Sequence, residues 1–84
     1  MKIDEHLIKK VLEKLYQDHF PYSVRVSALQ DELQIDPHSI VAALYYLKDK
    51  GLVENSEDGW RINALGIDSL QGISLIQVVS PMRR

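Results

Sequence analysis

The sequence predicts an α+β fold in which three helices form one core and a small three-stranded antiparallel sheet packs at its edge, followed by a short C-terminal helix or tail. Three observations predict it: an apolar stripe at helical spacing near the N-terminus, a helix stop and restart at Asp36-Pro37, and two β-rich runs joined by a turn that ends in Asp58-Gly59. The chain of 84 residues is long enough for one small domain. We expect this domain over residues 1–72, with residues 73–84 as a tail.

The first helix is predicted by its apolar spacing. Apolar side chains stand at positions 3, 7, 8, 11, 12 and 15, which places them on one face of a helix that we expect from Ile3 to Phe20. Asp4 can cap its start. Pro21 ends the helix, because its ring removes a backbone donor and restricts the residue before it.

A short strand and a short second helix come next. Valines alternate with polar residues over 23–26, as they do in a half-buried strand. Ser27 and Gln30 have the spacing of a capping box, so we expect the second helix to start at Ser27. Asp36-Pro37 ends it, because a capping carboxylate followed by proline at the first helical position starts a new helix.

The third helix is expected from Pro37 to Lys50. Ile40, Leu44 and Leu47 fall on one face of it, and Gly51 follows its last residue. These three side chains should pin the helix against the first two, which leaves the opposite face for contacts outside the domain.

The remainder of the domain reads as a hairpin and a short helix. Two strand candidates, Leu52 to Glu54 and Trp60 to Ile62, flank a polar stretch whose Asp58-Gly59 favours a hairpin. Asn63 can cap a last helix over Ala64 to Gln71, which ends before a glycine.

The tail leaves two alternatives open. Residues 73–79 are rich in β-branched side chains, which favour a strand, while Leu75, Val78, Val79 and Met82 stand at helical spacing. Its apolar residues can form a homodimer interface or can fold back along the first helix and complete the core of one copy.

Two segments carry a resemblance to a known superfamily. Residues 39–53, SIVAALYYLKDKGLV, resemble the recognition helix and its exit into the wing in bacterial and archaeal MarR-like and PadR-like regulators. Residues 60–70, WRINALGIDSL, are similar to the second wing strand and the helix after it. With the first helix, the resemblance covers about residues 3–71 and implies a winged helix-turn-helix fold, with 37–50 as the recognition helix.

The resemblance implies a double-stranded DNA-binding transcriptional regulator. In a helix-turn-helix, residues near the start of the recognition helix contact base edges, and basic side chains hold phosphates. The candidate DNA-binding residues are His38, Ser39, Ala42, Tyr45, Tyr46, Lys48, Arg25 and Arg61. Alternatively, His38 and Ser39 only stabilise the helix start, and one of the two tyrosines packs under the wing.

Charge favours a different function. The formal net charge is −2, acidic residues outnumber Arg61 along the predicted hairpin, and residues 37–47 contain no Lys or Arg. A polyanion such as DNA is repelled by such a surface. The second interpretation is therefore a winged helix that binds another protein, through Tyr45 and Tyr46, without binding DNA.

Other classes have little support in the sequence. The chain has no cysteine, which excludes disulfides and thiolate zinc sites, and its three histidines are dispersed. We expect no catalytic site, metal or cofactor, because no glycine-rich phosphate loop and no nucleophile with a paired base can be identified. The longest apolar run, 40–47, is far shorter than the roughly 20 residues of a membrane span, and the N-terminus is too acidic for a signal peptide, so we expect a cytoplasmic protein.

Overall fold

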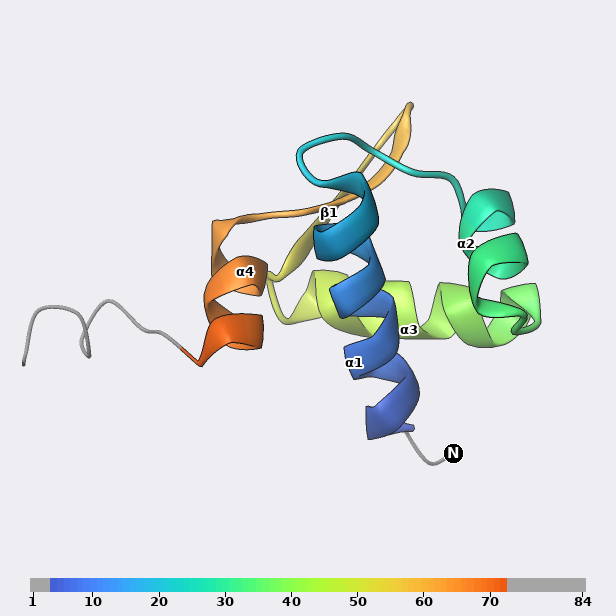
Figure 1. Ribbon diagram of the computed structural model, residues 1–84, viewed down its shortest axis with the longest axis horizontal. Coiled ribbons are helices and arrows are strands. Elements are labelled where there is room, and N and C mark those ends of the chain that lie inside the picture. Colours follow the sequence, from blue (N-terminus) through green and yellow to red (C-terminus); the bar gives the residue numbers. More distant parts are fainter. Residues whose placement is uncertain (1–3, 73–84) are drawn as a thin grey trace, which may run out of the picture.

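The computed structural model describes residues 4–72, and over that range the fold is α+β, as predicted (Figure 1). Its elements in chain order are α1 (Glu5–Lys14), the π-helical turn η1 (Leu15–His19), α2 (Val26–Leu33), α3 (Pro37–Asp49), β1 (Val53–Ser56), β2 (Gly59–Ile62) and α4 (Ala64–Gln71). In Figure 1, α1 crosses α3, while α2 and α4 lie near opposite ends of α3. The predicted start at Ile3 and the tail 73–84 lie outside the described residues.

The first helix has the predicted cap and the predicted end. The Asp4 carboxylate accepts hydrogen bonds from the amides of His6 and Leu7, at 3.1 and 3.2 Å. The helix continues through η1 and ends at His19, close before Pro21. Both boundaries follow from local chemistry, a carboxylate at the start and a proline at the end.

The predicted strand over 23–26 is reduced to one residue pair. Val24 forms an isolated antiparallel bridge with Trp60, through two backbone hydrogen bonds of 2.8 Å each. Among the described residues the sheet therefore has two strands, β1 and β2. The third strand does not extend because α2 begins at Val26, two residues after the bridge.

The predicted capping box at Ser27 is wrong. Arg25 occupies the N-cap position of α2 and makes no side-chain capping bond, so Ser27 is an exposed residue in the first turn of the helix. The carbonyl of Arg25 already accepts from the amides of Ala28 and Leu29, at 3.1 and 3.2 Å. The bridge at Val24 fixes the chain so close to α2 that the helix starts before the capping sequence.

The turn between α2 and α3 follows the prediction. Gln34 has a left-handed backbone, with φ of 58°, and Asp36 caps α3 with Pro37 as its first residue. Three residues therefore separate the two helices. α3 ends at Asp49, one residue before the predicted end, and Gly51 has φ of 79°.

The hairpin has a shorter turn than predicted. β1 runs to Ser56, so only Glu57 and Asp58 lie between the strands, and Val53 pairs with Ile62. Burial alternates along β2, where Trp60 and Ile62 are buried and Gly59 and Arg61 are half-buried. In β1 Val53 is buried and the other three residues are exposed.

The core lies between α1, α2, the inner face of α3 and the buried face of the hairpin. Ile40, Leu44 and Leu47 are buried, as predicted. The complete buried set among the described residues is Val11, Leu12, Leu15, Val24, Leu29, Ile40, Ala43, Leu44, Leu47, Val53, Trp60 and Ile62.

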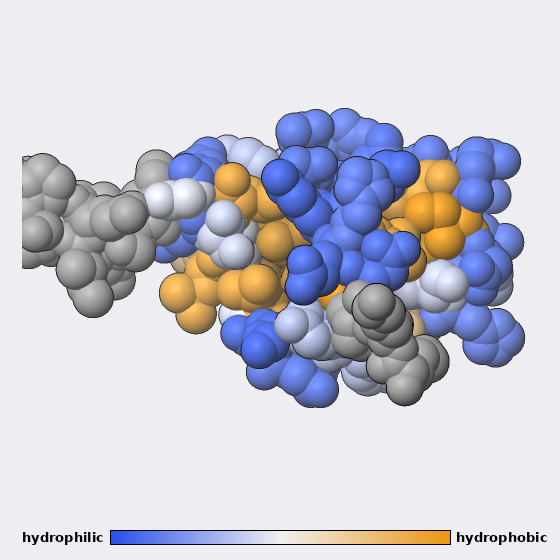
Figure 2. All heavy atoms as spheres, turned by 90° about the horizontal axis from the view of Figure 1, so that it is seen from below, coloured by the Kyte–Doolittle hydropathy of each residue, from blue (hydrophilic) through white to orange (hydrophobic). Residues whose placement is uncertain are grey.

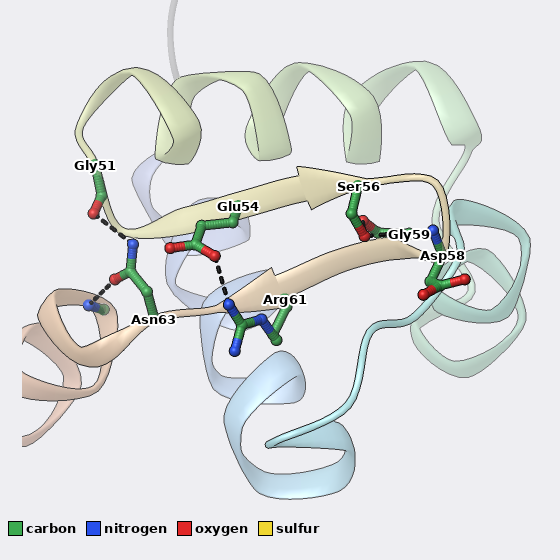
Figure 3. A network of polar contacts seen from close by, with 8 residues as sticks. Gly51, Glu54, Ser56, Asp58, Gly59, Arg61 and Asn63 are labelled. Atoms are coloured by element: carbon green, nitrogen blue, oxygen red, sulfur yellow. Dashed lines mark hydrogen bonds and ion pairs between the residues drawn. The ribbon is translucent and has the colours of Figure 1, made fainter.

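Asn63 joins α4 to the end of α3. Its side chain accepts from the Gly66 amide at 2.9 Å, which confirms the predicted cap, and donates to the Gly51 carbonyl at 2.8 Å (Figure 3). Gly66 packs closely here, since a Cβ atom on it would stand 2.3 Å from the Leu52 carbonyl oxygen. None of the helices within residues 4–72 combines the length and the apolar character of a membrane span.

Candidate functional site

The side of α3 that faces away from the core carries one exposed row of side chains, which we name the outer line: His38, Ala42, Tyr45 and Asp49. These positions are spaced by four, three and four residues, so they follow one face of the helix. All four are exposed, whereas the opposite face holds the core. The outer line is therefore available to a partner along the full length of α3.

The start of α3 is held by a carboxylate. Asp36 accepts from the Ser39 amide at 3.0 Å and from the Ser39 hydroxyl at 2.8 Å. These hydrogen bonds, the hydroxyl first, lower the pKa of Asp36 below its ordinary value. The hydroxyl proton of Ser39 is thus already used inside the domain, as the alternative interpretation of this residue proposed, while His38 is exposed beside it.

The two adjacent tyrosines point to different parts of the molecule. The Tyr45 ring meets Trp60 edge to face, with ring centroids 5.2 Å apart, and remains 49% exposed. Tyr46 is half-buried, and the Lys50 ammonium lies 5.5 Å from its ring centroid. Tyr45 therefore belongs to the outer line, whereas Tyr46 lies on its flank and is less exposed.

The solvent-facing side of the hairpin carries an ion pair. Glu54 and Arg61 stand opposite each other in the strand register, and Arg61 Nη2 donates to Glu54 Oε1 (Figure 3). The positive charge of Arg61 is therefore compensated. Glu57 and Asp58 are exposed at the tip, so the hairpin presents acidic groups to solvent.

Three other cations are exposed near α3 and the hairpin. Lys48 and Lys50 are exposed at the end of α3, and Arg25 is exposed directly after the bridge residue Val24. Arg25 lies beside the hairpin, since a Cβ on Gly59 would stand 3.1 Å from its backbone nitrogen. The ion pairs found within residues 4–72 involve none of these three cations.

The structure thus brings together part of the predicted site. His38, Ala42 and Tyr45 share the outer line, Ser39 and Tyr46 lie on one flank of it, and Lys48 is at its end. Sequence reasoning missed Trp60, which fixes Tyr45. Its burial was readable from strand alternation, but its contact with Tyr45 joins two distant elements and has no sequence signal.

No group of three or more His, Asp or Glu side chains within the described residues is arranged to hold a metal ion. His19 pairs with Glu32 at 2.9 Å, at the junction of η1 and α2. Comparison of the sequence with models of known protein families found no match, and comparison with curated proteins found none either.

Proposed function

We propose that the chain is a winged helix-turn-helix domain that binds double-stranded DNA and acts as a transcriptional regulator. In this proposal α2 and α3 form the helix-turn-helix, and β1 and β2 form the wing. The observation that carries it is the outer line of α3, which is exposed along the helix while the other face anchors it in the core. The three-residue turn between the helices and the hairpin directly after α3 support it.

The start of α3 is the part that enters the major groove. A major groove about 12 Å wide admits a helix, and the first turns of a recognition helix contact base edges. His38 can donate to or accept from a base, and the small Ala42 side chain lets the helix backbone come close. Tyr45 follows on the same line with its hydroxyl, and its ring is supported by Trp60.

Few cations are available to hold phosphates. Arg25, Lys48 and Lys50 are exposed and free of ion pairs within residues 4–72. Arg61 contributes only if it leaves Glu54 for a phosphate oxygen. With about three phosphate contacts per copy, the logarithm of the affinity should fall against the logarithm of the salt concentration with a slope of about −3.

The test is a titration of the full chain onto a labelled random-sequence duplex at low and at moderate salt, read by fluorescence anisotropy. The double variant Lys48→Glu, Lys50→Glu should weaken binding and reduce the salt slope by about two. The matched control is Lys9→Glu, Lys10→Glu on α1, which changes the net charge equally on a helix that packs against the opposite face of α3. That control should bind nearly as the parent does.

Three results would overturn the proposal. If the chain does not bind the duplex at low salt, the electrostatic contribution that supports sequence recognition is missing. If the two double variants lose equal DNA affinity, the net charge of the chain accounts for binding and the position of Lys48 and Lys50 does not. Selection from a random duplex pool that returns no shared sequence shows that the outer line reads no bases.

One observation favours a second function, docking to another protein. The outer line contains no Lys or Arg, it ends on Asp49, and the hairpin tip beside Arg25 is acidic. An exposed tyrosine supported by a buried tryptophan is typical of a protein-binding hot spot. If duplex binding is absent, this function predicts a partner with a basic surface whose binding is lost in Tyr45→Ala and retained in Tyr46→Ala.

A further inference from the structure

A groove lies on the side of the molecule that is formed by α1, the end of α3 and α4. Its volume is about 670 Å³, and its wall contains both apolar side chains and the last described residue. The apolar lining consists of Ile8, Leu12, Tyr46, Leu47, Leu52 and Leu70. Figure 2 shows apolar surface over the region of α4, bordered by hydrophilic residues.

The groove has a polar rim and an apolar base. Leu12 and Leu47 belong to the core, with 4% and 1% exposure, and so form its base. Glu5, Lys9 and Lys50 stand around it with charges of both signs. An apolar base of this kind inside a charged rim suits an apolar chain segment better than a charged ligand.

We propose that residues 73–79 of the same chain bind in this groove. The segment continues directly from Gly72, which is itself part of the groove wall. Its sequence is ISLIQVV, with apolar side chains at five of its positions: Ile73, Leu75, Ile76, Val78 and Val79. It carries no charge, so it matches the apolar lining without burying an ion.

The geometry at the end of α4 permits this course. Gly72 has φ of 68° and caps α4, a conformation in which the chain leaves the helix axis. The lining residues of α1 run from Glu5 to Leu12, a rise of about 10 Å in a helix. Seven extended residues reach about 23 Å, so the segment can pass along the whole groove from its entry at Gly72.

Binding within one chain is favoured over binding between copies by this same connection. A segment tethered at the groove wall has a high effective concentration there, which a second copy reaches only at high protein concentration. The groove contains no residue of the outer line, although Tyr46 and Lys50 stand on its wall. Its occupancy is therefore tested separately from DNA binding.

Photo-cross-linking of the full chain tests the proposal. Gln77 is replaced by p-benzoylphenylalanine, which leaves every apolar residue of the segment in place, and equal amounts of ¹⁴N- and ¹⁵N-labelled protein are mixed before irradiation. We expect cross-links to groove residues in which both joined peptides carry the same isotope, because they come from one chain. Cross-links of mixed isotope in the groove would instead identify a second copy as the occupant, and cross-links no more frequent than from a probe at Glu57 would show an empty groove.

A matched pair of substitutions checks that the groove itself is the receptor. Ser69 is exposed on the rim and Ser27 is exposed on α2, away from the groove. Ser69→Trp should fill the groove and abolish the cross-link within each copy, whereas Ser27→Trp should leave it unchanged. Loss in both variants or in neither would contradict the proposal, and circular dichroism confirms that both remain folded.

Discussion

The two faces of α3 are built from the same helix and have different roles. On the inner face Ile40, Leu44 and Leu47 are at most 1% exposed, and all three are aliphatic. On the outer line His38, Ala42 and Tyr45 are exposed and chemically unlike one another. Hydrophobic periodicity therefore identifies how this helix is anchored, but the chemistry of its exposed face depends on side chains that the period leaves unspecified.

The largest expected effect comes from the inner face. Leu44→Ala removes methyl groups from a fully buried position and leaves a cavity, so we expect the free energy of unfolding to fall by about 2–5 kcal/mol. Urea denaturation measures it. Ala42→Ser on the outer line is the control, with an expected change within about 0.5 kcal/mol. Comparable losses at the two positions would show that the faces do not differ in the way described.

The next effect concerns the contact between the hairpin and the bridge residue Val24. Gly59 has φ of 129°. A Cβ atom on Gly59 would stand 2.4 Å from the carbonyl oxygen of Val24, which is the residue that forms the bridge with Trp60. Gly51 also has a positive φ, 79°, but a Cβ there would meet no atom within 4 Å.

Gly51→Ala should therefore lower the free energy of unfolding by about 1–2 kcal/mol, because alanine is strained in the left-handed conformation. Gly59→Ala adds a steric conflict with backbone and should lower stability by about 1–3 kcal/mol more. Urea denaturation followed by Trp60 fluorescence compares the two. Equal losses would mean that the close approach of the hairpin to Val24 is not needed for the fold.

Sequence patterns predicted the elements that depend on neighbours in the chain. The caps at Asp4, Asp36 and Asn63 are confirmed, because a capping side chain acts on amides two or three residues away. The start of α2 was wrong, because the bridge between Val24 and Trp60 overrides the local capping signal at Ser27. Local chemistry was readable and long-range pairing was not.

The candidate site shows the same division. The helical period predicted that α3 turns one face away from the core, and His38, Ala42 and Tyr45 are exposed on that face. The divergence of Tyr45 from Tyr46, and the neutralisation of Arg61 by Glu54, depend on the hairpin and on α1. The DNA-binding role of the candidate residues stays a prediction.

A smaller effect is expected at Tyr45, the outer-line residue whose ring contacts the buried Trp60. Tyr45→Ala removes the edge-to-face contact with Trp60, which should reduce stability by about 0.5–1.5 kcal/mol. Tyr45→Phe retains the ring and should restore most of this loss, which separates the ring contact from the hydroxyl. A loss in Tyr45→Ala as large as that in Leu44→Ala would place Tyr45 in the core.

The smallest effect appears only in acid and comes from the cap of α3. Hydrogen bonds from Ser39 lower the pKa of Asp36 in the folded protein below its ordinary value of 3.8. A lowered folded pKa means that the carboxylate stabilises the fold above the unfolded pKa, and that this contribution is lost as the pH falls through the folded value. Asp36→Asn keeps a capping side chain without the titration, so its stability should fall less steeply from about pH 4 downward.

Asp18 provides the matched case away from α3. The pKa of Asp18 is also lowered, first by its hydrogen bond with Lys14, whose ammonium lies 2.6 Å from its carboxylate. Asp18→Asn should therefore flatten the same acid range, while removing an exposed ion pair of α1 and η1 instead of a helix cap. Stability measured against pH in urea for each variant and for the double variant should show two additive changes, because the two carboxylates lie on different elements and share no partner. An acid slope that is unchanged in Asp36→Asn would show that the hydrogen bonds from Ser39 do not hold the start of the outer line in the folded state.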